Sequence, residues 1–288
     1  MKKLFGLLLL LVGLPVLAAV HYIRAAATNE NNFQIEVTTS TSPQNFICKF
    51  VSPGTLHVDW GDTTTDDFNT TITNTHTYAT AGIYTIRMSG HVHNIDFFVL
   101  PDPGTGTPDL ITAIKTPIRG VDGLITALEM FKHGHNIPTI PVGMFDSCTN
   151  ITSFYDAFLA CNSLQYIPTN LFHFQTNVTS FYGTFKGCTT LTSIPAELFY
   201  HATNNLNFNW TFQGCTGLMA IPDLLFSRCP DVTSYAYCFR GCTSLDGNTP
   251  HDGSGNHLWE LTPEPTGTLC FGSDTGLDDY ASIPADWK

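Results

Sequence analysis

The chain has 288 residues, of which 43% are hydrophobic and only 12% are charged, and its formal net charge is −12 at pH 7. The hydrophobic content is enough to form cores, which excludes a globally disordered chain, and the length allows about two modest domains. The negative charge repels phosphate backbones and argues against a nucleic-acid partner.

Residues 1–27 have the pattern of an export signal. Two lysines precede an apolar run from Leu4 to Val20, and small residues that suit signal cleavage follow at 18–19 and at 25–27. The alternative is an uncleaved N-terminal anchor, because 17 apolar residues lie at the lower limit of the roughly 17–25 that span a bilayer. The signal predicts a secreted or cell-surface protein, with no membrane span apart from this segment if it is retained.

Residues 28–100 predict a small β-sandwich, because short segments of alternating apolar and polar residues are separated by turn signals. The clearest predicted strands are residues 33–37, 46–50, 56–60 and 83–87.

Two motifs of this region resemble the PKD domain family. They are Val58-Asp-Trp-Gly-Asp-Thr63 and the later segment Thr75-His-Thr-Tyr-Ala-Thr-Ala-Gly-Ile-Tyr-Thr-Ile86. Thr63 departs from the family pattern, which usually has Gly there, and the front strand is short. The resemblance implies an immunoglobulin-like β-sandwich of the kind found in extracellular modules.

Carboxylates cluster around the first of these motifs, at Asp59, Asp62, Asp66 and Asp67. Carboxylates at short spacing suit a hard cation such as Ca²⁺. The favoured interpretation is that they cap backbone N–H groups of a turn. Two pairs with His-x-His spacing offer nitrogen ligands for Zn²⁺, but the sequence places no third ligand beside either: His91 with His93, and His133 with His135. No cofactor is therefore predicted.

Residues 101–109 are rich in Pro and Gly and predict a short linker. A phrase with a 27-residue period follows, over residues 110–246, and its first copy is degenerate, as expected of an N-terminal cap. Its two clearest markers are an Ile-Pro step at Ile140, Ile167, Ile194 and Ile221, and a Cys at Cys161, Cys188, Cys215 and Cys242. This period lies in the leucine-rich-repeat range and predicts a solenoid with short parallel strands and helical or 3-10 turns.

Aromatic residues also recur at fixed positions of the phrase. Three columns are Phe145/Phe172/Phe199/Phe226, Phe154/Phe181/Phe208/Tyr235 and Phe158/Phe185/Phe212/Phe239. The last two are four residues apart, which fits one helical or 3-10 turn that buries a Phe pair. The Leu-x-x-Ile-Pro segment is the predicted strand, which Pro should end. We interpret these columns as core in preference to a carbohydrate-stacking ladder, and the repeated Cys as buried thiols in preference to disulfides.

The phrase, in the form Asn177-Val-Thr-Ser-Phe-Tyr-Gly-Thr-Phe185, resembles the repeats of the BspA-like leucine-rich-repeat family and of mycoplasma surface proteins, with Phe replacing Met. The resemblance covers residues 124–246. It implies a bacterial surface or secreted protein linked to adhesion, and it transfers no functional residue.

Recognition should then use positions at which the copies differ. The candidate ligand-binding residues are Tyr155, Tyr166, Tyr182, Thr139, Ser193 and Met219. After Asp246 the phrase breaks, and residues 247–288 predict a C-terminal cap whose last strand, near a revived Ile-Pro step at Ile283, closes the sheet.

These features predict an exported, non-enzymatic binding or adhesion protein whose partner is a protein or glycan on a host or neighbouring cell. The alternative is a structural subunit of an extracellular assembly, such as a filament, a surface layer or a virion appendage, which would involve self-assembly. An enzyme is not expected, because no recognisable nucleophile, phosphate-loop or metalloprotease motif is present.

Overall fold

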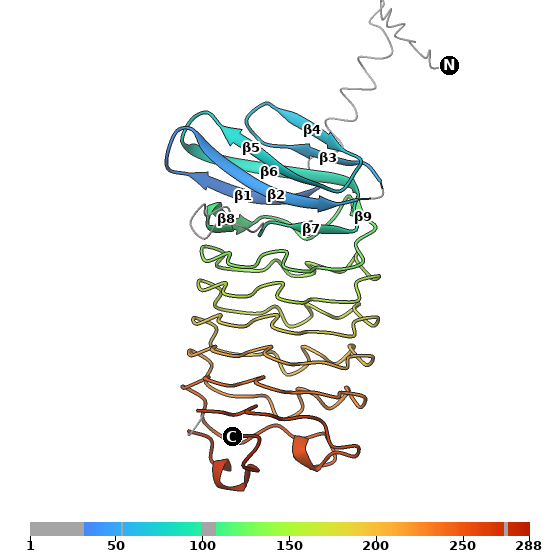
Figure 1. The fold of residues 1–288 in the computed structure, drawn as a ribbon, viewed down its shortest axis with the longest axis vertical. Coiled ribbons are helices and arrows are strands. Elements are labelled where there is room, and N and C mark those ends of the chain that lie inside the picture. Colours follow the sequence, from blue (N-terminus) through green and yellow to red (C-terminus); the bar gives the residue numbers. More distant parts are fainter. Residues whose placement is uncertain (1–31, 53, 99–107, 274–275) are drawn as a thin grey trace, which may run out of the picture.

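The computed structural model describes residues 32–98 except 53, residues 108–273, and residues 276–288. Two β-sheets lie at one end of an elongated molecule, and stacked layers of turns and coil continue from them to the C-terminus (Figure 1). The predicted signal segment and most of the predicted linker lie outside the described residues. Within the described ranges, no helix is long and apolar enough to cross a membrane.

The N-terminal region consists of two antiparallel sheets, as the alternating sequence pattern predicts. One sheet has the order β4-β3-β6-β1-β8, in which β8 is Ile111–Ile114, and the other has the order β5-β2-β7. Their first seven strands are β1 (Phe33–Thr39), β2 (Gln44–Val51), β3 (Leu56–Asp59), β4 (Thr65–Phe68), β5 (Ile72–Tyr78), β6 (Gly82–His91) and β7 (Asn94–Asp96). All four segments predicted as strands lie within or overlap these elements, so the sandwich-like arrangement is confirmed.

The two sheets enclose an apolar core. In β1 every second residue is buried, because successive side chains of a strand point to opposite faces. Trp60 is fully buried and packs edge-on against Phe46, with 6.4 Å between ring centroids. The Tyr78 hydroxyl donates a 3.0 Å hydrogen bond to the Trp60 carbonyl, which joins the turn after β3 to the end of β5.

Two strands that follow the predicted linker also belong to this region. After the 3-10 helix η1 (Pro108–Leu110), β8 (Ile111–Ile114) pairs with β1, and β9 (Val121–Asp122) pairs in parallel with β6. Residues that the sequence assigns to the first degenerate copy thus extend the sandwich sheet. The apolar core continues from the sheets into the layers.

From residue 124 onward the chain is largely turns and coil held together by hydrogen bonds between layers. Isolated parallel bridges join Ser153 to Ser180, Ser180 to Asn207, and Asn207 to Ser234. After each bridge, every second N–H of one layer donates to a carbonyl of the next layer. Examples are Phe154 N to Ser180 O at 3.0 Å and Phe158 N to Thr184 O at 2.9 Å.

The predicted helical or 3-10 turn at the Phe pair is wrong. The segment forms two consecutive turns, in which Ala157 N donates to Phe154 O and Cys161 N donates to Phe158 O. The third residue of each turn, Asp156 or Ala160, has a positive φ of 52° or 57°, as a type II turn requires. A helix cannot form here because alternate N–H groups point to the next layer.

The predicted strand at Leu-x-x-Ile-Pro is also wrong. These segments are coil, and adjacent layers share one long hydrogen bond here, such as Thr192 N to Gln165 O at 3.5 Å and Met219 N to Thr192 O at 3.3 Å. Pro168 lies three residues after Gln165 and has no N–H that could continue a ladder of hydrogen bonds. The strand-like bridges form instead one residue before the first Phe of the pair.

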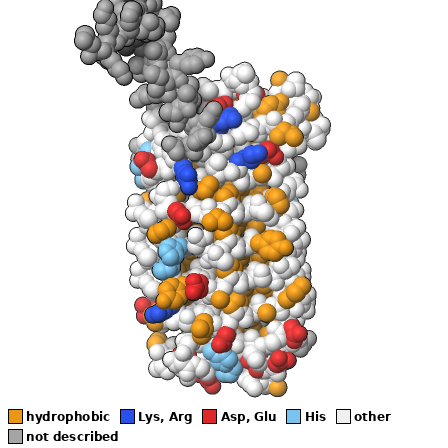
Figure 2. Space-filling model, turned by 180° about the vertical axis from the view of Figure 1, so that it is seen from behind, with side chains coloured by type: hydrophobic (Ala, Val, Ile, Leu, Met, Phe, Trp, Pro, Cys, Tyr) orange, Lys and Arg blue, Asp and Glu red, His pale blue; other side chains and the backbone are white. Residues whose placement is uncertain are grey.

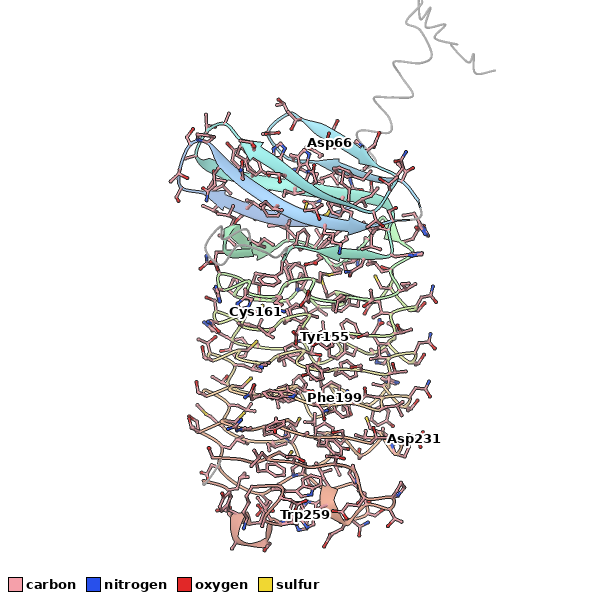
Figure 3. The ribbon with its side chains drawn as sticks, in the orientation of Figure 1. Asp66, Tyr155, Cys161, Phe199, Asp231 and Trp259 are labelled. Atoms are coloured by element: carbon pink, nitrogen blue, oxygen red, sulfur yellow. The ribbon has the colours of Figure 1, made fainter. Side chains whose placement is uncertain are left out.

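The aromatic columns lie in the core, as predicted. Rings of successive layers are nearly parallel, for example Phe154 and Phe181 at 5.7 Å and 3°, or Phe158 and Phe185 at 5.6 Å and 5°. The labelled Phe199 lies among these stacked layers in Figure 3.

The prediction of buried thiols is confirmed. The repeated Cys side chains are fully buried, and each donates a hydrogen bond to the carbonyl of a Phe in the preceding layer. The distance is 3.2 Å from Cys188 Sγ to Phe158 O. Burial raises the pKa of the Cys188 thiol to about 12, so this thiol stays protonated in the core.

The C-terminal segment covers the last layer with the Trp287 side chain. The strand predicted near Ile283 is wrong. Two 3-10 helices occur here, η2 (Leu258–Glu260) and η3 (Tyr280–Ser282), and the segment after Ile283 is turn and coil. Leu269 N donates to Asp286 O and Phe271 N donates to Trp287 O, both at 2.8 Å. Trp287 is fully buried and covers the end of the aromatic core.

Candidate binding surfaces

The acidic turn of the sandwich has its carboxylates engaged by the protein. Asp59 accepts the Gly61 N–H at 2.9 Å, and Asp62 accepts the Thr64 N–H at 3.0 Å, which is the capping role favoured from the sequence. Asp66 accepts the Trp60 indole N–H at 2.7 Å.

The remaining acidic contacts of this turn are made with histidines. Asp67 pairs with His57 at 2.8 Å, and the second oxygen of Asp62 pairs with His76 at 2.8 Å. Hydrogen bonds to Thr64 and to His76 outweigh burial and lower the pKa of Asp62. The four carboxylates therefore point to separate partners, and no three His, Cys, Asp or Glu side chains converge as metal ligands in the part of the chain that the structure describes.

The two His-x-His pairs are also engaged by neighbouring side chains. His91 contacts Asp122, and His135 contacts Asp109, both at 2.5 Å. His133 packs on Phe98 with 5.0 Å between ring centroids, and burial lowers its pKa.

The six candidate ligand residues fall on two separate runs of the layered chain. Thr139, Tyr166, Ser193 and Met219 belong to what we call the Ile-Pro face, which comprises residues 138–142, 165–169, 192–196 and 219–223. Tyr155 and Tyr182 belong to the turns that follow the parallel bridges.

The Ile-Pro face carries little charge and has exposed apolar side chains. Val142, Tyr166 and Met219 are 70%, 60% and 61% exposed, respectively. The first three copies of the face carry no charge, whereas in the fourth copy Asp223 occupies the position of Val142. Buried Leu and Ile on either side of the exposed pair hold the backbone beneath. In the described ranges the Tyr166 ring has no aromatic partner, so its flat surface is open to a ligand. Figure 2 shows one side of the column, on which hydrophobic side chains recur from layer to layer and charged side chains are sparse toward the middle.

A second surface, which we call the aromatic ridge, is formed by Tyr155, Tyr182, Trp210 and Tyr237 together with Lys186 and Arg240. Tyr155 and Tyr182 stack at 4.6 Å with 1° between ring planes, and Trp210 and Tyr237 stack at 4.3 Å with 26°. Because the rings of each pair cover one another, the ridge offers ring edges, hydroxyls and few open ring faces. Figure 3 places Tyr155 among the upper layers and Asp66 in the sandwich, so the ridge and the acidic turn are separate sites.

Cations lie directly on the ridge. The Lys186 ammonium is 4.2 Å from the centre of the Trp210 ring, and the Arg240 guanidinium is 5.6 Å from the centre of the Tyr237 ring. Sequence reasoning missed Trp210, Tyr237 and both cations. Aligning the copies at 27 residues could have found them, since Trp210 and Tyr237 occupy the positions equivalent to Asp156 and Gly183.

A polar pocket lies near the C-terminal end. It has a volume of about 280 Å³ and is lined by Ile221, Asp223, Asn248, Thr249 and His251. His251 pairs with Asp223 at 2.5 Å, and the Thr249 N–H donates to Asp279 at 3.1 Å. Thr249 is 1% exposed. Its hydroxyl lies 3.1 Å from His257 Nδ1 and donates a hydrogen bond to Asp279.

Comparisons of this chain with protein-family models, with curated proteins and with solved structures found no match.

Proposed function

We propose that the chain is an exported, non-enzymatic binding or adhesion protein that contacts a protein on the surface of a host or neighbouring cell. In this proposal the layers form a bacterial leucine-rich-repeat scaffold of the BspA-like class, and the PKD-like sandwich forms its N-terminal module. The 27-residue recurrence of the hydrogen bonds between layers supports the scaffold assignment.

The observation that carries the proposal is the Ile-Pro face. Exposed large apolar side chains that gather on one face mark a candidate interaction site, and interface cores are depleted in charge. Val142, Tyr166 and Met219 form exposed anchors on a backbone fixed by buried Leu and Ile side chains. A surface with this little charge fits a protein partner better than it fits a strongly charged ligand.

The binding experiment compares three forms of the mature chain on arrays of extracellular proteins and of glycans. The wild type is compared with the double variant Tyr166→Ser/Met219→Ser and with Phe174→Ser. Phe174 is 46% exposed but lies outside the Ile-Pro face, so its substitution is a matched control for loss of exposed apolar surface. We expect a protein spot that the wild type and the control bind and that the double variant loses.

Several outcomes would contradict the proposal. The first is that no spot is bound above a folded control protein, and the second is that the double variant binds as the wild type does. If the wild type self-associates in sedimentation and the double variant does not, the face joins copies of this chain, which is the result expected of the structural-subunit alternative.

A further inference from the structure

The few cations of the layered region are unevenly placed. From residue 124 to the C-terminus the sequence has only these Lys and Arg: Lys132, Lys186, Arg228, Arg240 and Lys288. Lys132, Lys186 and Arg240 occupy one column, because each is two 27-residue periods after the previous one. The intervening positions are the uncharged Leu159 and Gln213. One line along the column of layers therefore carries a cation at every second layer.

These cations differ in how they are neutralised. Lys132 pairs with Glu129 at 2.5 Å and with Asp156 at 3.3 Å. Lys186 and Arg240 make no ion pair with a carboxylate in the described ranges, and each is held against an aromatic ring. In a chain of net charge −12, Lys186 and Arg240 form a cationic surface with no direct carboxylate contact in the described ranges, although Asp156, which pairs with Lys132, lies near enough to attract Lys186.

The spacing selects the kind of anion. Neighbouring parallel strands lie about 4.8 Å apart, so cations two layers apart are separated by roughly 10 Å along the backbone stack. An extended peptide places side chains of one face about 6.6 Å apart, which does not match. A stiff linear polysaccharide with an anionic group on alternate sugars repeats over a comparable length. Its hydroxyls can bond to the polar groups between the cations, such as Gln213 and the Tyr182 hydroxyl.

We propose that the aromatic ridge between Tyr182 and Arg240 binds an anionic polysaccharide whose chain runs along the column of layers, with its acidic groups on Lys186 and Arg240. The edge of a sugar packs beside the stacked Trp210 and Tyr237 rings. This site is separate from the Ile-Pro face, and the inference does not depend on the protein partner proposed above.

The test uses hyaluronate, which has a carboxylate on alternate sugars, as the probe, with neutral dextran and poly-L-glutamate as comparison polymers. Binding to the purified protein is measured by calorimetry and by intrinsic tryptophan fluorescence, to which Trp210 contributes together with three other Trp residues. The fluorescence change that a bound chain causes should be lost in the variant Trp210→Phe. We expect hyaluronate to bind, dextran not to bind, and affinity to fall as salt is raised.

The decisive variants are Lys186→Gln/Arg240→Gln and the matched control Arg228→Gln/Lys288→Gln, which removes the same charge away from the ridge. Each lost charged contact should weaken hyaluronate binding on the order of tenfold, whereas the control should bind as the wild type does. Tyr166→Ser/Met219→Ser should also bind normally, which separates this site from the protein-binding proposal. The inference is overturned if hyaluronate does not bind at low salt, if both cation variants weaken binding equally, or if poly-L-glutamate binds as tightly as hyaluronate.

Discussion

Asn205 offers a sharp test of how the layers are stabilised. This residue is fully buried, and neither its amide nitrogen nor its carbonyl oxygen has a hydrogen-bond partner. The equivalent residues of the other layers are Ile151, Val178 and Val232, which are all buried. Asn205 therefore places two polar atoms in an otherwise apolar column.

The substitution Asn205→Val should stabilise the protein. A buried polar group without a partner costs about 1–3 kcal/mol, and Val is already accommodated one layer away on either side. We expect the free energy of unfolding to rise by about 1–3 kcal/mol. For a chain of this size the midpoint of thermal unfolding should rise by roughly 2–12 °C.

The measurement is urea unfolding followed by circular dichroism, together with a calorimetric scan of the same samples. The reverse substitution in the preceding layer, Val178→Asn, is the control and should lower the free energy of unfolding by at least about 2 kcal/mol. If Asn205→Val lowers the stability instead, the amide is hydrogen-bonded in solution and the reasoning about this column is refuted.

Two further predictions concern a turn and a buried carboxyl. Gly183→Ala should destabilise the protein by more than about 2 kcal/mol, because a Cβ there would lie 2.0 Å from Oδ1 of Asp156, which is buried and ion-paired with Lys132 and so cannot easily move aside. The control is Gly247→Ala, because Gly247 has a φ of 84° and open space around the added Cβ. It should lower the free energy of unfolding in urea by only about 1–2 kcal/mol. Equal losses for both variants would contradict the steric argument. Burial raises the pKa of Asp96 to about 7, so the folded state binds a proton that the unfolded state releases near pH 4. The free energy of unfolding should therefore fall as the pH rises from about 4 to 7 and then level off. Asp96→Asn should flatten this part of the pH profile. An unchanged profile in the variant would show that Asp96 does not cause the pH dependence.

Much of the core could be predicted because its residues repeat. A side chain such as Phe154 or Cys188 recurs in every layer with little change, and only burial in a common environment imposes so constant a choice at so many equivalent positions. The strands of the sandwich were predictable for a similar reason, since alternation in β1 reflects which face is buried.

The local backbone of the layers could not be predicted in the same way. Two Phe residues four apart fit a helix face, but they also fit two consecutive turns in which each Phe begins a turn. The choice depends on whether alternate N–H groups bond within the segment or to the next layer. Residues such as Asp156 and Trp210 also adopt positive φ values without being Gly, so the turn leaves little trace in their identity.

The candidate surfaces show the same division. Tyr166 and Met219 are exposed as their variability predicts. The pairing of Tyr155 with Tyr182, and of Lys186 with Trp210, depends on distances between layers, which a linear pattern does not contain.

The sequence by itself thus determined the period, the buried positions and the sandwich strands, because burial acts on each residue separately and recurs with the chain. Only the tertiary structure decided that turns replace helices, that the Ile-Pro segments are coil, and that cations meet aromatic rings along a ridge. Most of those features arise from hydrogen bonds and ring contacts between residues of neighbouring layers, such as Phe158 with Thr184 or Lys186 with Trp210, and their geometry is set when the layers stack.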